Sequence, residues 1–476
     1  MTNRRKLVGN SISIFANRVV QSIATFVLTV GIARILGPFE LGQFMLASAY
    51  YFLFMTIGSQ GLKVLFAREL SRNPEQAPHY LGNGTWLQLA LCLVCYGGLA
   101  LLVRVLPYSH DTAAACYILG LAIIPFSLSN VTEALFQAFE KLHLMAISTV
   151  PIYIIRVVIS IILMKLGYGV ITICWVQVIS EVLVLVIEWI LILTLVKPAW
   201  RINWQFMKNT LRMSRSFMVI EGVSIVQTRL QAVLLSLLAG EVVVGLYGAI
   251  NQLTQPFQII THSLIVAIFP TMSKSTALGA ERQRQITQRV LELLLLVALP
   301  TIVILFFLGD QILVFLYRNP EFALGADALK ITAVALIAVA IYRPLGYVLV
   351  ANGLERINMR EVIITTIIGS VISVPLIALF QLEGAGLVYV VIQTSSFVQY
   401  AYAVNKRLFK VNVWEILWRP LLVSSLTAIC IVVVTQFTQE ILPTLIISGG
   451  VYVLLLGVAV MYVIGSKAPN VLQSTK

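Results

Sequence analysis

The feature that most constrains this chain is a series of long apolar runs that recur along its whole length. A helix of about 20 apolar residues crosses the hydrocarbon core of a bilayer, where every backbone polar group must be hydrogen-bonded internally. Charged residues make up only 11% of the 476 positions, too few to cover a water-soluble protein of this size. We therefore predict an all-α polytopic membrane protein with about fourteen transmembrane helices. The predicted spans are 11–33, 42–66, 81–106, 113–138, 144–164, 169–196, 213–238, 242–270, 286–308, 326–352, 357–381, 384–405, 414–437 and 441–465.

The first run resembles the apolar part of a signal peptide, but polar Asn17 and Arg18 interrupt it and no small-residue cleavage site follows. We expect it to be retained as the first span. With the N-terminus inside, 23 of the 33 Lys and Arg residues fall on inner segments and five on outer segments. This asymmetry predicts that both termini are cytoplasmic, and it explains the net charge of +13 by membrane topology rather than by nucleic-acid binding.

An internal repeat organises the chain. When the stretch Asn10–Arg72 is moved forward by 203 residues, Gly42 falls on Gly245 and Phe66 falls on Phe269 without a gap. A second match aligns 136–143 with 351–358. Repeated pairs of apolar helices with polar interiors are typical of transporters. Because each repeat holds an even number of spans, the two repeats are expected to be parallel and related by an axis along the membrane normal.

The repeat predicts four parts. They are an N-lobe of six spans at 1–196, a cytoplasmic amphipathic linker at 197–212, a C-lobe of six spans at 213–410, and two further spans with a C-terminal tail at 411–476. The linker interleaves Trp, Phe and Met with cations. That composition favours a helix in the cytoplasmic interface near anionic lipid, with a solvated linker as the alternative.

Polar residues follow one face of the first, seventh and eighth spans. Three such stripes cannot all face lipid, so we predict that they line a shared water-filled cavity. The candidate substrate-binding residues are Asn17, Arg18, Gln21 and Thr25 in the first span, Glu221, Ser224, Thr228 and Arg229 in the seventh, and Asn251, Gln255, Gln258 and His262 in the eighth.

The chemistry of this predicted cavity favours an anionic, sugar-bearing ligand. Guanidinium groups such as those of Arg18 and Arg229 bind phosphate through two parallel hydrogen bonds, whereas amides and hydroxyls suit sugar hydroxyls. A structural alternative also exists, in which Arg18 pairs with Glu221 across the repeat axis. Arg229 likewise has either a ligand-binding or a bracing role.

Other charges lie inside the predicted spans. Lys63 ends its span near the cytoplasm, where a lysine side chain can extend to the interface. Ion pairs are expected for Arg156, Arg343, Glu133, Glu181 and Glu188. Glu292 either lies near the cavity or pairs with Arg289, one turn earlier.

Three motifs resemble those of a known family: LGPFELGQF at 36–44, AREL at 67–70 and FQAFEK at 136–141. They are similar to the polysaccharide and O-antigen-type lipid-linked oligosaccharide flippases of the multidrug/oligosaccharidyl-lipid/polysaccharide (MOP) exporter superfamily. This resemblance implies two six-helix lobes around a cavity and alternating access. The expected substrate is an undecaprenyl-pyrophosphate-linked glycan, flipped to the outer leaflet of a bacterial inner membrane. An H⁺ or Na⁺ coupling ion and a polysaccharide polymerase or other assembly proteins are the expected partners, with no nucleic acid and no cofactor.

Three alternatives remain. A lipid II flippase fits the fourteen spans, but such proteins place more arginines in the first spans than the single Arg18 here. A drug or cation antiporter of the same superfamily normally has twelve spans and an acidic cavity. A membrane polymerase or ligase would need a large outer loop, and the short outer loops, together with the lack of an Asp-x-Asp pair or a His cluster, indicate that the chain is not an enzyme and holds no metal.

Overall fold

The described part of the protein consists of helices and their connections. The computed structural model describes residues 3–59, 61–438 and 440–465, and within these ranges it leaves out the side chains of 3–16, 18, 216–221, 223–224, 413, 460 and 462–465. The helices are α1 Asn3–Ile35, α2 Pro38–Ser59, α3 Leu62–Arg72, α4 Ala77–Val105, α5 His110–Leu121, α6 Ile123–Ala138, α7 Leu142–Lys165, α8 Val170–Leu193, α9 Trp204–Leu238, α10 Glu241–Ser275, α11 Ala280–Tyr317, α12 Ala326–Ala351, α13 Glu355–Arg407, α14 Val413–Phe437 and α15 Ile441–Gly465. Short 3₁₀ turns, η1 Pro74–Gln76, η2 Thr276–Leu278 and η3 Pro320–Gly325, lie in three of the connections.

The all-helical multi-span prediction is confirmed. Among the described residues, eleven helical segments are long and apolar enough to cross a membrane, and two shorter apolar segments, Val19–Ile35 and Ile225–Leu238, belong to α1 and α9. Helix α13 contains two of the predicted spans, because Gln381 interrupts it with a left-handed backbone (φ 46°, ψ −112°). The second predicted span is divided into α2 and α3 by Gly61 (φ 66°).

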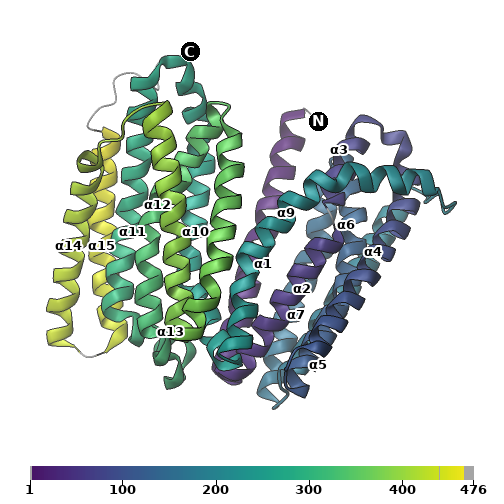
Figure 1. Cartoon of the computed structure of the whole chain (residues 1–476), viewed down its shortest axis with the longest axis horizontal. Coiled ribbons are helices and arrows are strands. Elements are labelled where there is room, and N and C mark those ends of the chain that lie inside the picture. The colour runs from purple at the N-terminus through teal and green to yellow at the C-terminus, as the bar shows by residue number, and fades with distance from the viewer. Residues whose placement is uncertain (1–2, 60, 439, 466–476) are drawn as a thin grey trace. The chain divides into compact units, whose positions relative to one another are not determined.

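Contacts divide the chain into two units, Met1–Gly248 and Ala249–Lys476, so that the boundary falls within α10. In the first unit α1 packs against α7, α2 against α9, and α6 against α4 and α8 (Figure 1). In the second unit α12 packs against α11 and α13, and α14 lies beside both α11 and α15. Helix α9 opens the second sequence repeat yet packs within the first unit. The repeats and the contact units are therefore different divisions of the chain, and the predicted lobe boundaries stay a prediction.

A glycine crossing in the first unit reflects the repeat directly. A Cβ atom on Gly42 would lie 1.7 Å from the carbonyl oxygen of Glu241, and one on Gly245 would lie 2.0 Å from that of Pro38. Gly42 aligns with Gly245 at the repeat shift, and Pro38 aligns with Glu241 at the same shift. The start of α2 and the start of α10 therefore contact each other through equivalent backbone atoms, at a distance that only glycine permits.

The segment between α8 and α9 is attached to α4. The amide of Ala199 donates to the carbonyl of Pro78 at 2.8 Å, and the amide of Asn203 donates to Asn83 Oδ1 at 2.7 Å. The Asn203 side chain then caps α9 by accepting from the Phe206 amide. Residues 204–212 of the expected linker are the first turns of α9.

Candidate functional site

A cavity of about 500 Å³ lies inside the first unit, among α1, α2, α3, α6, α7 and α8. Its polar lining residues are Asn17, Gln21, Thr25, Ser48, Lys63, Glu133, Gln137, Arg156, Gln177 and Glu181, and its aromatic ones are Phe44, Tyr51, Phe52, Phe126 and Tyr153. The helices that carry these residues are otherwise apolar. The cavity is therefore a polar compartment within a membrane-embedded bundle, where charged groups are found chiefly at functional positions.

Helix α1 supplies one wall of this cavity. Asn17, Gln21 and Thr25 are spaced by four residues, which places their side chains on one face of the helix. Asn17 is nearly buried, and its Oδ1 lies 3.0 Å from the Thr149 hydroxyl of α7, the helix against which α1 packs. The structure therefore brings together these three predicted site residues.

Arg156 and Glu181 form an ion pair in the cavity wall. The Arg156 guanidinium donates to Glu181 Oε1 at 3.3 Å, and both side chains are almost fully buried. The guanidinium also lies 4.4 Å from the centre of the Tyr153 ring, which provides a cation–π contact. The expectation of an ion pair holds for these two residues.

Lys63 is the second cation that lines the cavity. Its ammonium group donates to Glu133 Oε2 on α6, so the prediction that Lys63 merely extends to the membrane surface is wrong. The break at Gly61 is the physical reason, because α3 begins there as a separate helix and packs against α6. Lys63 also lines a neighbouring cavity of about 490 Å³, together with Thr228 of α9.

Arg229 lies in the same unit, on α9. Its guanidinium is 4.5 Å from the centre of the Phe52 ring, and Phe52 lines the main cavity. Among the described residues, no ion-pair partner is found for Arg229, and its Nε atom has no hydrogen-bond acceptor. A largely desolvated guanidinium with open donor positions can bind an anion strongly.

The four candidates of the eighth span lie on α10, in the second unit. Gln255 and His262 are exposed, whereas Asn251 and Gln258 are half-buried. Gln258 Oε1 accepts from Arg343 at 3.2 Å, and Gln258 Nε2 lies 3.4 Å from the Tyr389 hydroxyl. Arg343 was expected to form an ion pair. It instead donates to the amide oxygen of Gln258, a neutral acceptor that stabilises the guanidinium.

Three candidates lie outside the described side chains: Arg18, Glu221 and Ser224. Their backbones belong to α1 and α9, and their roles stay predictions. The expected pairing of Arg289 with Glu292 stays a prediction. Arg419 of α14 donates to Glu292 at 2.7 Å, and this ion pair joins α14 to α11.

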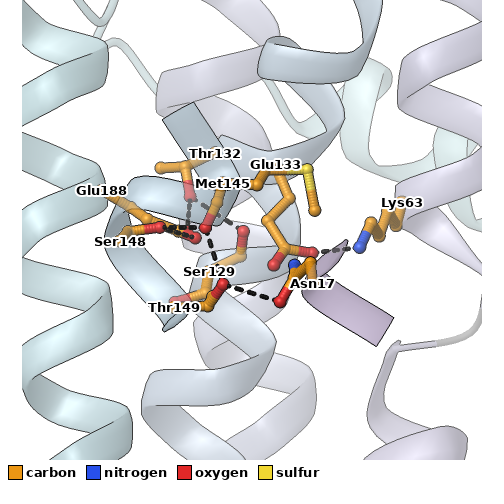
Figure 2. A network of polar contacts seen from close by, with 9 residues as sticks. All are labelled: Asn17, Lys63, Ser129, Thr132, Glu133, Met145, Ser148, Thr149 and Glu188. Carbon is orange, nitrogen blue, oxygen red and sulfur yellow. Dashed lines mark hydrogen bonds and ion pairs between the residues drawn. The ribbon is translucent and has the colours of Figure 1, made fainter. Parts of the chain in front are cut away.

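Two buried carboxyls have roles that the sequence did not indicate. Glu188 was expected in an ion pair, but it accepts from hydroxyls of Thr132 and Ser148 (Figure 2). Glu361 of α13 accepts from the hydroxyls of Ser396 and Tyr400. Their signal in the sequence is only a lone carboxylate in an apolar run, and nothing there identifies hydroxyl partners that lie 35 to 56 residues away.

The electrostatics of the cavity follow from these pairs. Among its described lining residues, two cations and two carboxylates are matched as Lys63 with Glu133 and Arg156 with Glu181. The wall is thus polar without a large net charge. It can form hydrogen bonds to a hydroxyl-rich ligand through its amides, and it can exchange an internal ion pair for a contact with a charged ligand.

Residues 7–276, more than half of the chain, match the family model described as "Polysaccharide biosynthesis protein". The chain belongs to this polysaccharide biosynthesis family. A second model, MatE, matches residues 223–379. No match was found among curated protein sequences.

Solved structures show the fold of this family member. The lipid II flippase MurJ in an inward closed conformation matches with a TM-score of 0.74 at 16% identity, over 96% of this chain and 99% of MurJ. An inward-facing multidrug resistance transporter of the MATE family matches with a TM-score of 0.64 at 13% identity, over 81% of this chain and 94% of that transporter. A MOP superfamily transporter from Pyrococcus furiosus matches with a TM-score of 0.53 at 14% identity, over 84% of this chain and 95% of that transporter. The protein is thus a multi-pass membrane protein with the transporter fold of the MOP superfamily.

Proposed function

We propose that this protein flips a polyprenyl-pyrophosphate-linked oligosaccharide, with undecaprenyl as the lipid, from the cytoplasmic to the outer leaflet. The observation that carries this proposal is the polar cavity of about 500 Å³ within a bundle of apolar helices. A glycan cannot cross hydrocarbon without such a compartment, because each of its hydroxyls would lose its hydrogen bonds to water. Membership of the polysaccharide biosynthesis family supports a glycan-bearing substrate.

The cavity chemistry suits both parts of such a substrate. Asn17, Gln21 and Gln137 offer amides that hydrogen-bond sugar hydroxyls. Arg229 lies behind this lining, against the ring of the cavity residue Phe52, and its guanidinium is the proposed group for the pyrophosphate, as the predicted role of Arg18 also is. The polyprenyl chain needs no binding site of comparable polarity, since it can stay in the lipid.

Transport would follow alternating access, as the MOP fold and its repeats favour. We infer a location in the bacterial inner membrane with both termini in the cytoplasm, because Lys and Arg concentrate on the segments assigned to that side. H⁺ or Na⁺ is the proposed coupling ion. The reaction involves no bond making or breaking in the substrate, and the protein is proposed to act as a transporter rather than an enzyme.

A cation antiporter is the second candidate function. Two carboxylates, Glu133 and Glu181, line the cavity, and the MatE match covers part of the second repeat. Carboxylates of this kind attract organic cations. Each of them already contacts a cation of this chain, however, which leaves little negative charge for a ligand.

Leaflet exchange in proteoliposomes tests the proposal. A fluorescent undecaprenyl-pyrophosphate oligosaccharide, lipid II and a fluorescent organic cation would be assayed in parallel, with and without a proton or sodium gradient. We expect exchange of the oligosaccharide lipid above that of protein-free vesicles. Transport of the organic cation without exchange of either lipid would refute the proposal in favour of an antiporter, and exchange of lipid II alone would reassign the substrate.

A further inference from the structure

Glu188 is a fully buried carboxyl on α8, about two helical turns along from the cavity-lining Glu181 of the same helix. Its Oε2 lies 2.6 Å from the Thr132 hydroxyl of α6, and its Oε1 lies 3.1 Å from the Ser148 hydroxyl of α7 (Figure 2). No ion-pair partner for Glu188 is found among the residues that the structure describes. Burying an ionised carboxylate without a counter-charge is costly, so its protonation state must be balanced by these two hydroxyls.

The two hydroxyls have more acceptors than protons. Thr132 Oγ1 lies within hydrogen-bonding distance of Glu188 Oε2 and also of the Ser129 carbonyl, at 2.8 Å. Ser148 Oγ lies near Glu188 Oε1 and also near the Met145 carbonyl, at 2.9 Å. A hydroxyl carries one proton, and a carbonyl oxygen carries none. Four hydrogen bonds would need four protons, and the two hydroxyls supply only two. The four contacts therefore cannot all be hydrogen bonds at once while Glu188 is ionised.

The cluster is satisfied in either protonation state of the carboxyl. When Glu188 is ionised, Thr132 and Ser148 both turn to donate to it, and the two carbonyls keep their own intrahelical bonds. When Glu188 takes up a proton from water on Oε2, it donates to Thr132 Oγ1, and Thr132 turns to donate to the Ser129 carbonyl. We propose that Glu188, with the hydroxyls of Thr132 and Ser148, is a reversible proton-binding site in the N-terminal unit.

The contact distances favour a proton over a metal cation. Oxygen ligands of a hard cation lie about 2.3–2.6 Å from the ion, which separates neighbouring ligands by roughly 3.3 Å or more. The contact of 2.6 Å between Glu188 Oε2 and Thr132 Oγ1 is a direct hydrogen bond and leaves no space for an ion between these atoms.

The site is close to the ionic groups of the cavity. Among the described residues, Glu133, adjacent to Thr132 on α6, Tyr153 of α7 and Lys63 of α3 are titratable groups that interact electrostatically with Glu188. The other two helices that contact α8 carry titratable groups that interact with other α8 residues: Cys116 of α5 with Cys174, and Tyr51 of α2 with Glu181. Ionised Glu188 adds a negative charge beside the Lys63–Glu133 pair, and protonation removes it.

Hydrogen bonds also extend from this cluster to the cavity surface. The Met145 carbonyl, which is close to Ser148, accepts from the Thr149 hydroxyl at 2.7 Å. Thr149 in turn contacts Asn17, which lines the cavity (Figure 2). The cluster is therefore connected to a cavity-lining side chain through the Met145 carbonyl and Thr149. This inference does not depend on the identity of the transported substrate.

Infrared difference spectroscopy of the full-length protein in lipid tests the proposal. Spectra would be recorded from about pH 5 to about pH 9, a range that includes the titration of perturbed buried carboxyls. We expect a carbonyl stretching band of a buried carboxylic acid that disappears as the pH rises. Glu188→Gln should remove this band, whereas Glu75→Gln, at an exposed carboxylate, should keep it.

Thr132→Val provides a test that retains the carboxyl and the side-chain volume. It removes the donor to the ionised form and the acceptor for the protonated form; because the hydrogen bond to the charged form is the stronger of the two, the midpoint of the band should move upward by about one pH unit. The proposal would be overturned by a band insensitive to Glu188→Gln, by a Glu188 band that does not change with pH, or by an unchanged midpoint in Thr132→Val. A shift of the band at constant pH when Na⁺ replaces K⁺ would overturn it in favour of a sodium site.

Discussion

Replacing Gly42 by alanine tests the close crossing between α2 and α10. The added Cβ would lie 1.7 Å from the carbonyl oxygen of Glu241 and 2.6 Å from its carbonyl carbon. Real Cβ atoms essentially never approach closer than 3.0 Å, so the two backbones must separate by about 1.3 Å, the difference between 3.0 and 1.7 Å. Because the obstructing atoms are backbone, no side-chain rotation can relieve the overlap.

The expected cost follows from two opposing effects. Overpacking of a close contact costs roughly 1–3 kcal/mol, and replacing a helical glycine by alanine returns about 0.5–1 kcal/mol of conformational entropy. We therefore expect Gly42→Ala to lower the free energy of unfolding by about 1–2 kcal/mol. Gly245→Ala should cost a similar amount, since its Cβ would lie 2.0 Å from the Pro38 carbonyl oxygen.

Unfolding of the purified protein in mixed micelles, with increasing denaturing detergent, measures this effect. Gly97→Ala is the matched control, because Gly97 is also helical and a Cβ there would have nothing within 4 Å. It should be neutral or stabilising. If Gly42→Ala were as stable as Gly97→Ala, the close crossing would not exist in the folded protein and the reasoning would fail.

Two ion pairs give further predictions for the same assay. Arg156→Met leaves buried Glu181 without a counter-charge and should lower the free energy of unfolding by about 3–5 kcal/mol, with most of this recovered when Glu181→Met is added. No recovery in the double variant would contradict a pairing role. Arg419→Met should cost less, because the Arg419 side chain is 25% exposed and that of Arg156 only 9%, so that water can reach the space that the guanidinium leaves beside Glu292, a carboxylate that is itself only 8% exposed. An equal or larger loss for Arg419→Met would contradict this ranking.

The sequence predicts the helices of this protein well, because hydrophobic length alone determines where a helix can cross a membrane. The repeat was equally readable, and the contact between Gly42 and Gly245 shows that the aligned positions are equivalent in space as well. The divisions within spans were harder to predict. Gly61 and Gln381 interrupt helices in apolar surroundings, where hydropathy changes little.

The partners of buried charges could not be predicted from the sequence. Lys63 and Glu133 are 70 positions apart, and their pairing depends on how α3 packs against α6. Glu188 illustrates the same limit. A carboxyl in an apolar run indicates that some partner exists, but only the packing of α6 and α7 against α8 shows that the partners are hydroxyls rather than cations.

The most direct test of the proposed function is the exchange rate of a fluorescent undecaprenyl-pyrophosphate oligosaccharide in proteoliposomes that contain Arg229→Ala. Arg284→Ala is the matched control, because this arginine pairs with Glu281 at the exposed start of α11. Loss of charged hydrogen bonds to the pyrophosphate should slow exchange by Arg229→Ala at least about tenfold and leave the control unchanged. Exchange by Arg229→Ala at the rate of the control would contradict a cationic pyrophosphate site at this position, and no exchange by the unaltered protein would contradict the flippase itself.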